Sequence, residues 1–499
     1  IRSLNKDMII VSPTWGIDQK GVARLWYQFL HNDHGVIFWD NDKSRHKFIE
    51  KADGSLTSRA KVFQQDLHEL RGGLGKLILG SERLHDRIAV LYSHPSIRVH
   101  WMLQYLNLGR EWILRESFNE YRELNFNRLR MALLNLIEDH FLQYDFISYV
   151  QLAQGKLDRG EYDLLFLPRT IVISDVEAAA IERFVERGGT VVADCLCGLM
   201  DESGKARPGG GALDKIFGFR SLEGAAGVLN RVSATVAETV NLGGVPALVN
   251  HYGRGKAIYL DRSISEYYLQ RQEPGTDTEL FSLFSGVFEA SGISYPAKIT
   301  FQDGSRLPGT ELIRYRNGDR TVLSLHRNPL VRVVGVGGTE KVDNAAFEKV
   351  ETVRLILPDT CHVYDLRKGK YLGHSDNFTF QFDPWRPSVL TLSSEKLAPP
   401  VVHPEDFTLT LIPGQPVVFE LKLSPLNSTC STRKNVVSVK VTGPDSRRLY
   451  HYEDNISFTG DTYRFTLSLA VNDQEGEYTV TFRDASTGFS TSIRLQTAK

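Results

Sequence analysis

The chain has 499 residues, which is too many for one hydrophobic core and indicates three or four domains. Lys and Arg total 59 against 60 for Asp and Glu, so net charge gives no case for a nucleic acid or an anionic membrane as partner. No apolar run approaches the ~18 residues that cross a bilayer, and four cysteines argue against a disulfide framework.

The chain starts at Ile1 with neither an initiator methionine nor a signal-peptide pattern, so we expect a processed chain or a fragment. No pair of Cys or His residues has zinc-site spacing, and we predict no metal and no cofactor. The composition is that of a soluble protein; its location stays open, with secreted and periplasmic as alternatives.

Residues 1–80 predict a strand–helix–strand–helix series. The strands are Met8–Val11 and Gly35–Trp39, and the helices cover Val22–Leu30 and Ser58–Leu70. Such a series is a quarter of a (β/α)8 barrel, which cannot close by itself. We therefore interpret residues 1–80 as the incomplete C-terminal end of a TIM barrel.

Residues 81–299 alternate buried strands with helices. Ser174 is a suitable N-cap for the helix that Gly188 and Gly189 end. The alternation predicts a flavodoxin-like α/β domain. The expected strands are Ile88–Tyr92, Phe146–Val150, Leu164–Leu167, Thr190–Ala193 and Ala257–Leu260, and the expected helices are Asn127–Phe141, Asp175–Arg187 and Thr278–Ser291.

After residue 299 the pattern changes to short alternating strands separated by turn residues, which predicts two all-β domains. Residues 300–398 are expected to form a β-sandwich and residues 399–499 an immunoglobulin-like β-sandwich. The predicted strands include Leu312–Arg316, Thr321–Leu325, Thr352–Leu357, Cys361–Asp365, Val389–Leu392, Phe407–Leu411, Val437–Val441 and Tyr478–Phe482.

Several segments in this order resemble family 42 β-galactosidases. Residues 88–96, 163–168, 184–194 and 253–260 resemble their trimerisation domain, a class I amidotransferase-like module that follows the catalytic barrel. Residues 21–42 resemble the last barrel strand and the helix before it. The resemblance implies the C-terminal portion of a retaining β-glycosidase, most similar to β-galactosidases, that hydrolyses terminal β-linked sugars. It also implies a homo-trimer in which this domain helps wall the neighbour's active site.

A retaining glycosidase uses two carboxylates about 5 Å apart, one as acid/base and one as nucleophile. By the resemblance, the acid/base belongs to the fourth barrel strand, which this sequence lacks. The nucleophile would be a glutamate near Val11–Trp15, where there is none. We therefore expect both carboxylates largely outside this chain, and the catalytic residues stay unassigned.

The residues left at the predicted carboxyl ends of the barrel strands are candidates for substrate binding: Trp15, Asp18, Trp39 and Asp40. Indole rings stack on sugar faces, and carboxylates accept hydrogen bonds from hydroxyls, so an oligo- or polysaccharide is the expected substrate. In the alternative interpretation, Trp39 packs the barrel top and Asp40 caps a loop.

An amidotransferase-like fold raises the question of a nucleophilic cysteine, which would need a Gly-x-Cys-x-Gly turn. In the segment Ala193–Gly198 the turn position is held by Leu196, and Cys195 and Cys197 each miss it by one residue. We therefore predict structural packing for both cysteines.

Two classes of function stay open. In one, the chain is part of a glycosidase, and another polypeptide or a longer precursor supplies the rest of the barrel. In the other, it is a non-catalytic scaffold that oligomerises and binds carbohydrate. An Asn-Glu pair at a strand end upstream of Ile1 would favour the first.

Overall fold

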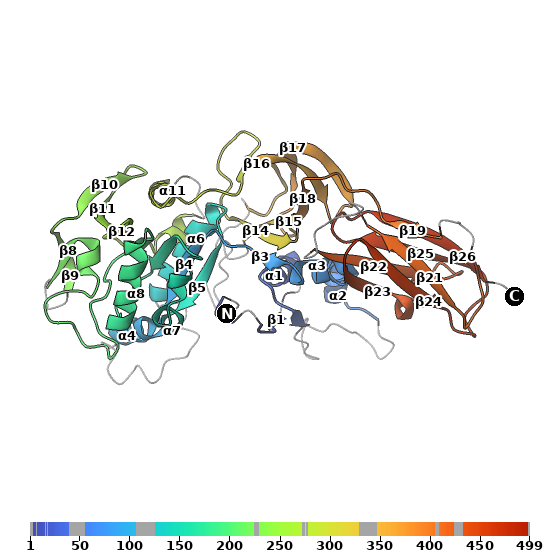
Figure 1. The fold of residues 1–499 in the computed structure, drawn as a ribbon, viewed down its shortest axis with the longest axis horizontal. Helices are drawn as coiled ribbons and strands as arrows, with labels where there is room; N and C mark the ends of the chain where they lie inside the picture. Colours follow the sequence, from blue (N-terminus) through green and yellow to red (C-terminus); the bar gives the residue numbers. More distant parts are fainter. Residues whose placement is uncertain are drawn as a thin grey trace.

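The computed structural model describes residues 3–497 apart from 6, 15, 17, 39–54, 106–124, 224–228, 272–274, 276–277, 329–346, 405–408 and 424–432. The chain forms an elongated row of parts (Figure 1). An α/β part lies at one end, short helices and a β-sheet occupy the middle, and paired sheets with the C-terminus lie at the other end. Among the described residues, no helix has the length and apolar character needed to span a bilayer.

The N-terminal part has the predicted strand–helix–strand–helix order. Strand β1 (Val11–Thr14) pairs in parallel with β2 (Gly35–Phe38), and α1 (Gln19–Leu30) connects them. Helix α2 (Ser58–Glu69) then continues through the π-helical turn η1 (Leu70–Leu74) into α3 (Gly75–Leu79). A parallel pair with a helical crossover is the repeating unit of a (β/α)8 barrel.

The α/β part is built on a seven-stranded sheet in the order β10-β11-β12-β7-β6-β4-β5. The strands from β5 to β12 in this order are parallel, and β11 and β10 extend the sheet in antiparallel pairing. The strands are β4 (Ile88–Tyr92), β5 (Tyr144–Ser148), β6 (Leu164–Leu167), β7 (Thr190–Ala193), β10 (Glu238–Leu242), β11 (Val245–Tyr252) and β12 (Gly255–Tyr259).

Helices cover both faces of this sheet, because its strands are apolar on both sides. One apolar cluster joins α6 and α11 to Val90 and Phe166, and the other joins α8 to Leu91 and Leu165. The helices are α4 (His94–Tyr105), α6 (Asn125–Asp139), α7 (Tyr149–Ala153), η3 (Lys156–Arg159), α8 (Asp175–Glu186), α9 (Asp214–Phe217), α10 (Tyr267–Gln270) and α11 (Thr278–Ala290). Two further strands, β8 (Phe219–Glu223) and β9 (Leu229–Ala234), pair only with each other.

The middle β-sheet has seven strands, and its edge strand β3 comes from the segment that precedes the α/β part. The segments predicted as strands at Thr352–Leu357 and Cys361–Asp365 are the two halves of one strand, β16, with a register shift between Ile356 and Cys361. The strands are β3 (Glu82–Arg83), β13 (Lys298–Phe301), β14 (Thr310–Asn317), β15 (Arg320–Arg327), β16 (Glu351–Asp365), β17 (Lys370–Phe382) and β18 (Ser388–Ser393).

The C-terminal part consists of two sheets whose inward side chains share one core that includes Phe419, Val439 and Phe482. The three-stranded sheet contains β19 (Val401–His403), β21 (Pro416–Lys422) and β24 (Thr462–Ser468). The five-stranded sheet contains β20 (Leu409–Leu411), β22 (Lys434–Thr442), β23 (Asp454–Thr459), β25 (Glu477–Asp484) and β26 (Ser490–Thr497), with a short turn η7 (Tyr450–Tyr452) between β22 and β23.

One buried cluster holds the N-terminal part against the two β parts. It contains Trp26 of α1, Leu77 of α3, Tyr315 of β14, and Val436 and Ala485 of the C-terminal part. Burying such side chains contributes roughly 1.5–3 kcal/mol each. The helices after β1 and β2 therefore have a fixed place relative to the sheets that follow.

Candidate functional site

The carboxyl ends of β1 and β2 lie side by side, since Thr14 is paired with Phe38. Of the substrate-binding candidates, Asp18 is described and lies close to this edge. It is exposed, and its Oδ1 accepts hydrogen bonds from the backbone N–H groups of Lys20 (3.0 Å) and Gly21 (3.3 Å), which caps α1. The other candidates, Trp15, Trp39 and Asp40, follow the two strand ends in sequence and lie outside the described residues.

Arg59 in the first turn of α2 ties the two strand ends together. Its Nε donates to the carbonyl of Gly16 (2.9 Å) and its Nη2 to that of Thr14 (3.2 Å). The guanidinium carbon lies 5.8 Å from the ring centroid of Phe38. An arginine in an amphipathic helix reads as a surface residue, so the sequence pattern gave no signal for this contact, in which Arg59 is only 2% exposed.

A buried carboxylate, Asp66 of α2, locks the two helices to the segment between β17 and β18. The indole N–H of Trp26 donates to its Oδ1 (2.7 Å), and the guanidinium of Arg386 donates to both carboxylate oxygens, with Nη2 2.9 Å from Oδ2. Charge-assisted, two-pronged hydrogen bonds of this kind fix orientation as well as distance. The helices that support the strand ends are thereby held rigidly.

A second buried carboxylate, Glu311 of β14, joins the N-terminal part to the α/β part. Its Oε1 accepts a hydrogen bond from Nε2 of Gln143 (2.9 Å) and lies 3.1 Å from Nε2 of His31. Burial alone would raise the pKa of Glu311, but interactions with His31, His326 and Arg83 outweigh it and hold the pKa well below its usual range.

The nearby carboxyl of Glu138, in α6, is shifted the other way. Burial raises its pKa well above the ordinary value, and the charges of Glu311 and Asp139 add to the shift. Two carboxyls with opposite pKa shifts are an arrangement found in glycosidase sites. Here Glu138 and Glu311 are 2% and 0% exposed, so a sugar has no access to them, and they act as a structural junction.

The turn that follows β7 in the α/β part has a strained backbone. Leu196 adopts a φ of 51°, the left-handed conformation that a nucleophile turn requires, but its side chain has no nucleophile. Burial and the neighbouring Asp194 raise the pKa of the Cys195 thiol to about 12, and burial raises that of Cys197 well above its ordinary value. Neither thiol is prepared for nucleophilic catalysis.

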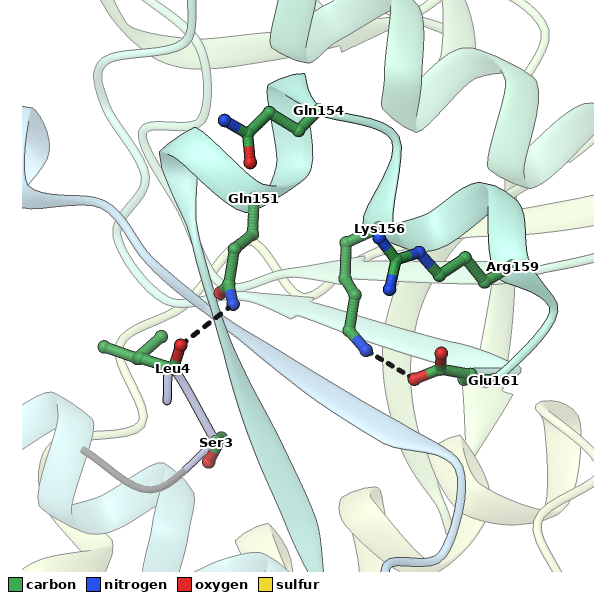
Figure 2. Close-up of a pocket in the computed structure, with 7 residues that line it drawn as sticks. All are labelled: Ser3, Leu4, Gln151, Gln154, Lys156, Arg159 and Glu161. Carbon is green, nitrogen blue, oxygen red and sulfur yellow. Dashed lines mark hydrogen bonds and ion pairs between the residues drawn. The ribbon is translucent and has the colours of Figure 1, made fainter. Parts of the chain in front are cut away.

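A polar pocket of about 360 Å³ lies between the segment before β1 and the α7–η3 region (Figure 2). Nε2 of Gln151 donates to the carbonyl of Leu4 (3.4 Å), and Nζ of Lys156 pairs with Glu161 (2.5 Å). Glu161 is the one carboxylate in the lining, so the pocket lacks the pair that glycosidic cleavage requires. The contact with Leu4 brings the N-terminal segment against the α/β part.

The family model of the β-galactosidase trimerisation domain matches residues 137–229. This match runs from the end of α6 to the first residue of β9 and includes β5, β6, β7 and β8. No curated protein sequence matches the chain.

Solved structures of family 42 β-galactosidases have a similar fold. A catalytic mutant of Gan42B from G. stearothermophilus has a TM-score of 0.52 and 16% identity, covering 75% of this chain and 50% of that one. The β-galactosidase from Bacillus circulans sp. alkalophilus has a TM-score of 0.51 and 19% identity, covering 77% of this chain and 55% of that one. The chain thus spans about half the length of the structures it matches.

The matched family model, the parallel β1–α1–β2 unit before it and the β-sheets after it lead to one conclusion. The chain carries the trimerisation domain of family 42 β-galactosidases and resembles the C-terminal part of these enzymes.

Proposed function

We propose that this chain is the C-terminal portion of a retaining β-glycosidase, most similar to β-galactosidases, that hydrolyses terminal β-linked sugars. The observation that carries the proposal is the order of parts: the parallel β1–α1–β2–α2 unit is followed along the chain by the domain that the trimerisation model matches. Both catalytic carboxylates would lie largely outside this chain, on the earlier strands of the barrel.

The proposal includes a finer description of the fold. Numbered among themselves in chain order, the parallel strands of the α/β sheet follow the order 2-1-3-4-5, which is that of flavodoxin-like domains. This supports a flavodoxin-like, class I amidotransferase-like module at residues 81–299. The residues after this module would form two further all-β parts: 300–398, whose described strands belong to one seven-stranded sheet, and 399–499, an immunoglobulin-like β-sandwich.

In such an enzyme the residues after β1 and β2 would contribute to the substrate site. Active sites of (β/α)8 barrels lie at the carboxyl ends of the strands, where Trp15, Asp18, Trp39 and Asp40 are located in sequence. The indole of Trp39 would stack on the apolar face of the terminal sugar, and the Asp40 carboxylate would accept hydrogen bonds from its hydroxyls. Arg59 would act as a positioning residue, because it holds both strand ends.

The functional form would be a homo-trimer acting on an oligo- or polysaccharide. The matched family model is that of a trimerisation domain, which supports assembly through residues 137–229 and their surroundings. By the same resemblance, this domain would also help wall the active site of a neighbouring subunit.

A scaffold without catalysis is the second candidate, and one observation favours it. The segment from Val11 to Asp18 contains no glutamate, and its one carboxylate, Asp18, is engaged in capping α1. A scaffold of this kind would oligomerise and bind carbohydrate without cleaving it.

The test uses the full-length polypeptide that contains these residues, with aryl β-galactosides and related aryl β-glycosides as substrates. The proposal predicts hydrolysis with the β-anomer as first product, as observed by NMR. Trp39→Ala should lower kcat/KM by about tenfold or more, since burying a large apolar side chain is worth roughly 1.5–3 kcal/mol. Tyr450→Ala, which removes an exposed aromatic ring in η7 of the C-terminal part, is the control and should leave kcat/KM unchanged. Sugar binding without hydrolysis of any of these substrates would reject the enzyme and favour the scaffold.

A further inference from the structure

A second pocket, of about 520 Å³, lies where α2, the turn after β16 and strands β22 and β25 meet. Its lining combines Lys61, His68 and Glu69 of α2 with Arg367, Lys440 and Arg483 from the β parts. The lining runs along α2 from Lys61, two residues after Arg59, to Glu69, and continues to Gly72 of η1.

The lining has a large excess of positive charge. Lys61, Arg367, Lys440 and Arg483 are cations at neutral pH, and Glu69 is the one anion. That anion already has a partner, because Arg367 donates to it from both Nε (2.6 Å) and Nη2 (3.1 Å). Three positive charges therefore remain without a counter-charge in the pocket wall.

The two cations from the C-terminal part are placed close together. Lys440 pairs with Thr481 and Arg483 with Ser438, so they are diagonal neighbours on the face of the β22–β25 pair that is turned away from the sandwich core. Like charges in this arrangement repel each other. Among the described residues, neither Lys440 nor Arg483 forms an ion pair: Arg483 donates to the carbonyl of Leu366, and Glu453, the carboxylate whose charge acts on Lys440, is paired with Arg448.

The pKa shifts of Lys440 and His68 agree with the excess of positive charge in the pocket wall. Desolvation, with Arg448 and Arg483 nearby, lowers the pKa of Lys440. Desolvation and a surrounding set of cations (Arg448, Lys440 and Arg71) likewise lower the pKa of His68. Holding uncompensated charges in a partly desolvated pocket destabilises the protein unless an anion occupies it.

We propose that this pocket binds an oxyanion group (a sulfate, phosphate or carboxylate) carried by a hydrophilic molecule. Lys440 and Arg483 contact the oxyanion, and Lys61 faces it from α2. The amide side chains of Gln64 and Gln65 also line the pocket and supply donors and acceptors for hydroxyl groups beside the anion. A sugar that carries a sulfate or carboxylate has this combination of groups.

The test is calorimetric titration of the full chain at low ionic strength, where charge interactions are least screened. The probes are inorganic sulfate, inorganic phosphate, galactose 6-sulfate and glucuronate, with galactose as the neutral comparison. The charged probes should bind and galactose should not. Tighter binding of the charged sugars than of the inorganic ions identifies an anionic sugar as ligand, and equal binding identifies the free ion.

The variants are Lys440→Gln and Lys61→Gln in the pocket, and Lys205→Gln in an exposed loop of the α/β part as matched control. A hydrogen bond to a charged group is worth roughly 1.5–3 kcal/mol, so each pocket variant should weaken binding by about ten- to a hundredfold. Lys205→Gln should bind as the unsubstituted chain does. Without any ligand, Lys440→Gln should raise the melting temperature, because it removes a repelled charge.

The proposal fails if none of the charged probes binds, if galactose binds equally well, or if the pocket variants bind as tightly as Lys205→Gln. None of these outcomes depends on hydrolysis. The proposed oxyanion site can therefore fail while the proposed glycosidase function holds, and the reverse.

Discussion

Asp139 and Arg271 form an ion pair that is closed to solvent on both sides. The guanidinium donates to both carboxylate oxygens, from Nη2 (2.6 Å) and Nε (3.0 Å). Asp139 also accepts from the hydroxyl of Tyr267 (2.7 Å) and the backbone N–H of Gly309 (2.9 Å). This one carboxylate therefore connects α6, α10 and the turn before β14.

Arg271→Met should lower the free energy of unfolding by about 3–5 kcal/mol, because it leaves the Asp139 carboxylate buried without its cation. Arg87→Met is the matched control. Arg87 also binds a carboxylate, Asp163, but both side chains are about half exposed (49% and 48%), and such pairs contribute about 1 kcal/mol or less. Urea unfolding measures both values, and equal losses would contradict this account of the buried pair.

His140, beside this pair, is a buried neutral histidine. Its ring stacks on Phe281 at 3.9 Å, and its Nε2 lies 2.9 Å from the hydroxyl of Ser285. Burial lowers the pKa of His140 to about 4. Its contribution to stability is therefore fully present above the unfolded pKa of about 6.5 and is lost as pH falls toward 4, because the unfolded chain takes up the proton more readily.

His140→Phe keeps the ring but cannot titrate. Between pH 7 and pH 4 the unsubstituted chain should lose about 3 kcal/mol more unfolding free energy than this variant. Comparing the two chains at each pH removes the contributions of other titrating groups. A difference between them that stays constant over this range would show that His140 titrates normally in the folded state.

At the level of elements, the crossing of α1 with the end of β1 depends on a close backbone contact. A Cβ on Gly21 would lie 2.7 Å from both Cα of Gly16 and the ring of Phe63. Alanine is favoured over glycine by roughly 1 kcal/mol inside a helix, so propensity and packing make opposite predictions here.

We expect packing to prevail, so Gly21→Ala should lower the unfolding free energy by about 1–2 kcal/mol despite its better helix propensity. Gly72→Ala, in η1, is the control. Its φ is −82° and a Cβ there meets nothing within 4 Å, so the change should stay within about 1 kcal/mol. If Gly21→Ala stabilises the chain, the close approach of α1 and the end of β1 is wrong.

The elements that could be predicted from the sequence are those with a strong local pattern. Periodicity and caps located α1, α2, α6, α8 and α11, and apolar runs located the parallel strands. The sequence pattern does not predict β3, β8 or β10: β3 has two residues and pairs with the distant β14, whereas β8 and β10 are short strands that pair with the strands following them, β9 and β11. The sequence pattern predicts two strands where the structure has one, β16. The reason is that Pro358 interrupts the alternation of apolar and polar residues at the point where the pairing register with β17 shifts.

The candidate site shows the same limit. The sequence order placed Asp18 near the strand ends, as the structure has it. The residues that hold those ends, Arg59 and Asp66, could not be found, because their partners lie up to 320 positions away. A charged side chain carries no local sign that a distant fold element will bury it.

On the scale of the whole molecule, the parts form one connected body. The cluster around Trp26 joins the N-terminal part to both β parts, and Glu311 joins the N-terminal part to the α/β part. Such rigidity is what a trimerisation domain would need to hold neighbouring barrels in a fixed arrangement.

The central claim is that this chain is the assembling, C-terminal part of a family 42-like enzyme. The most direct test is a native mass spectrum compared with the denatured mass of the same material. The account predicts an assembly of three copies of the polypeptide that contains these 499 residues, each at least 56.3 kDa. A single copy at every protein concentration tested would contradict it, because the domain that the family model matches would then not assemble the protein.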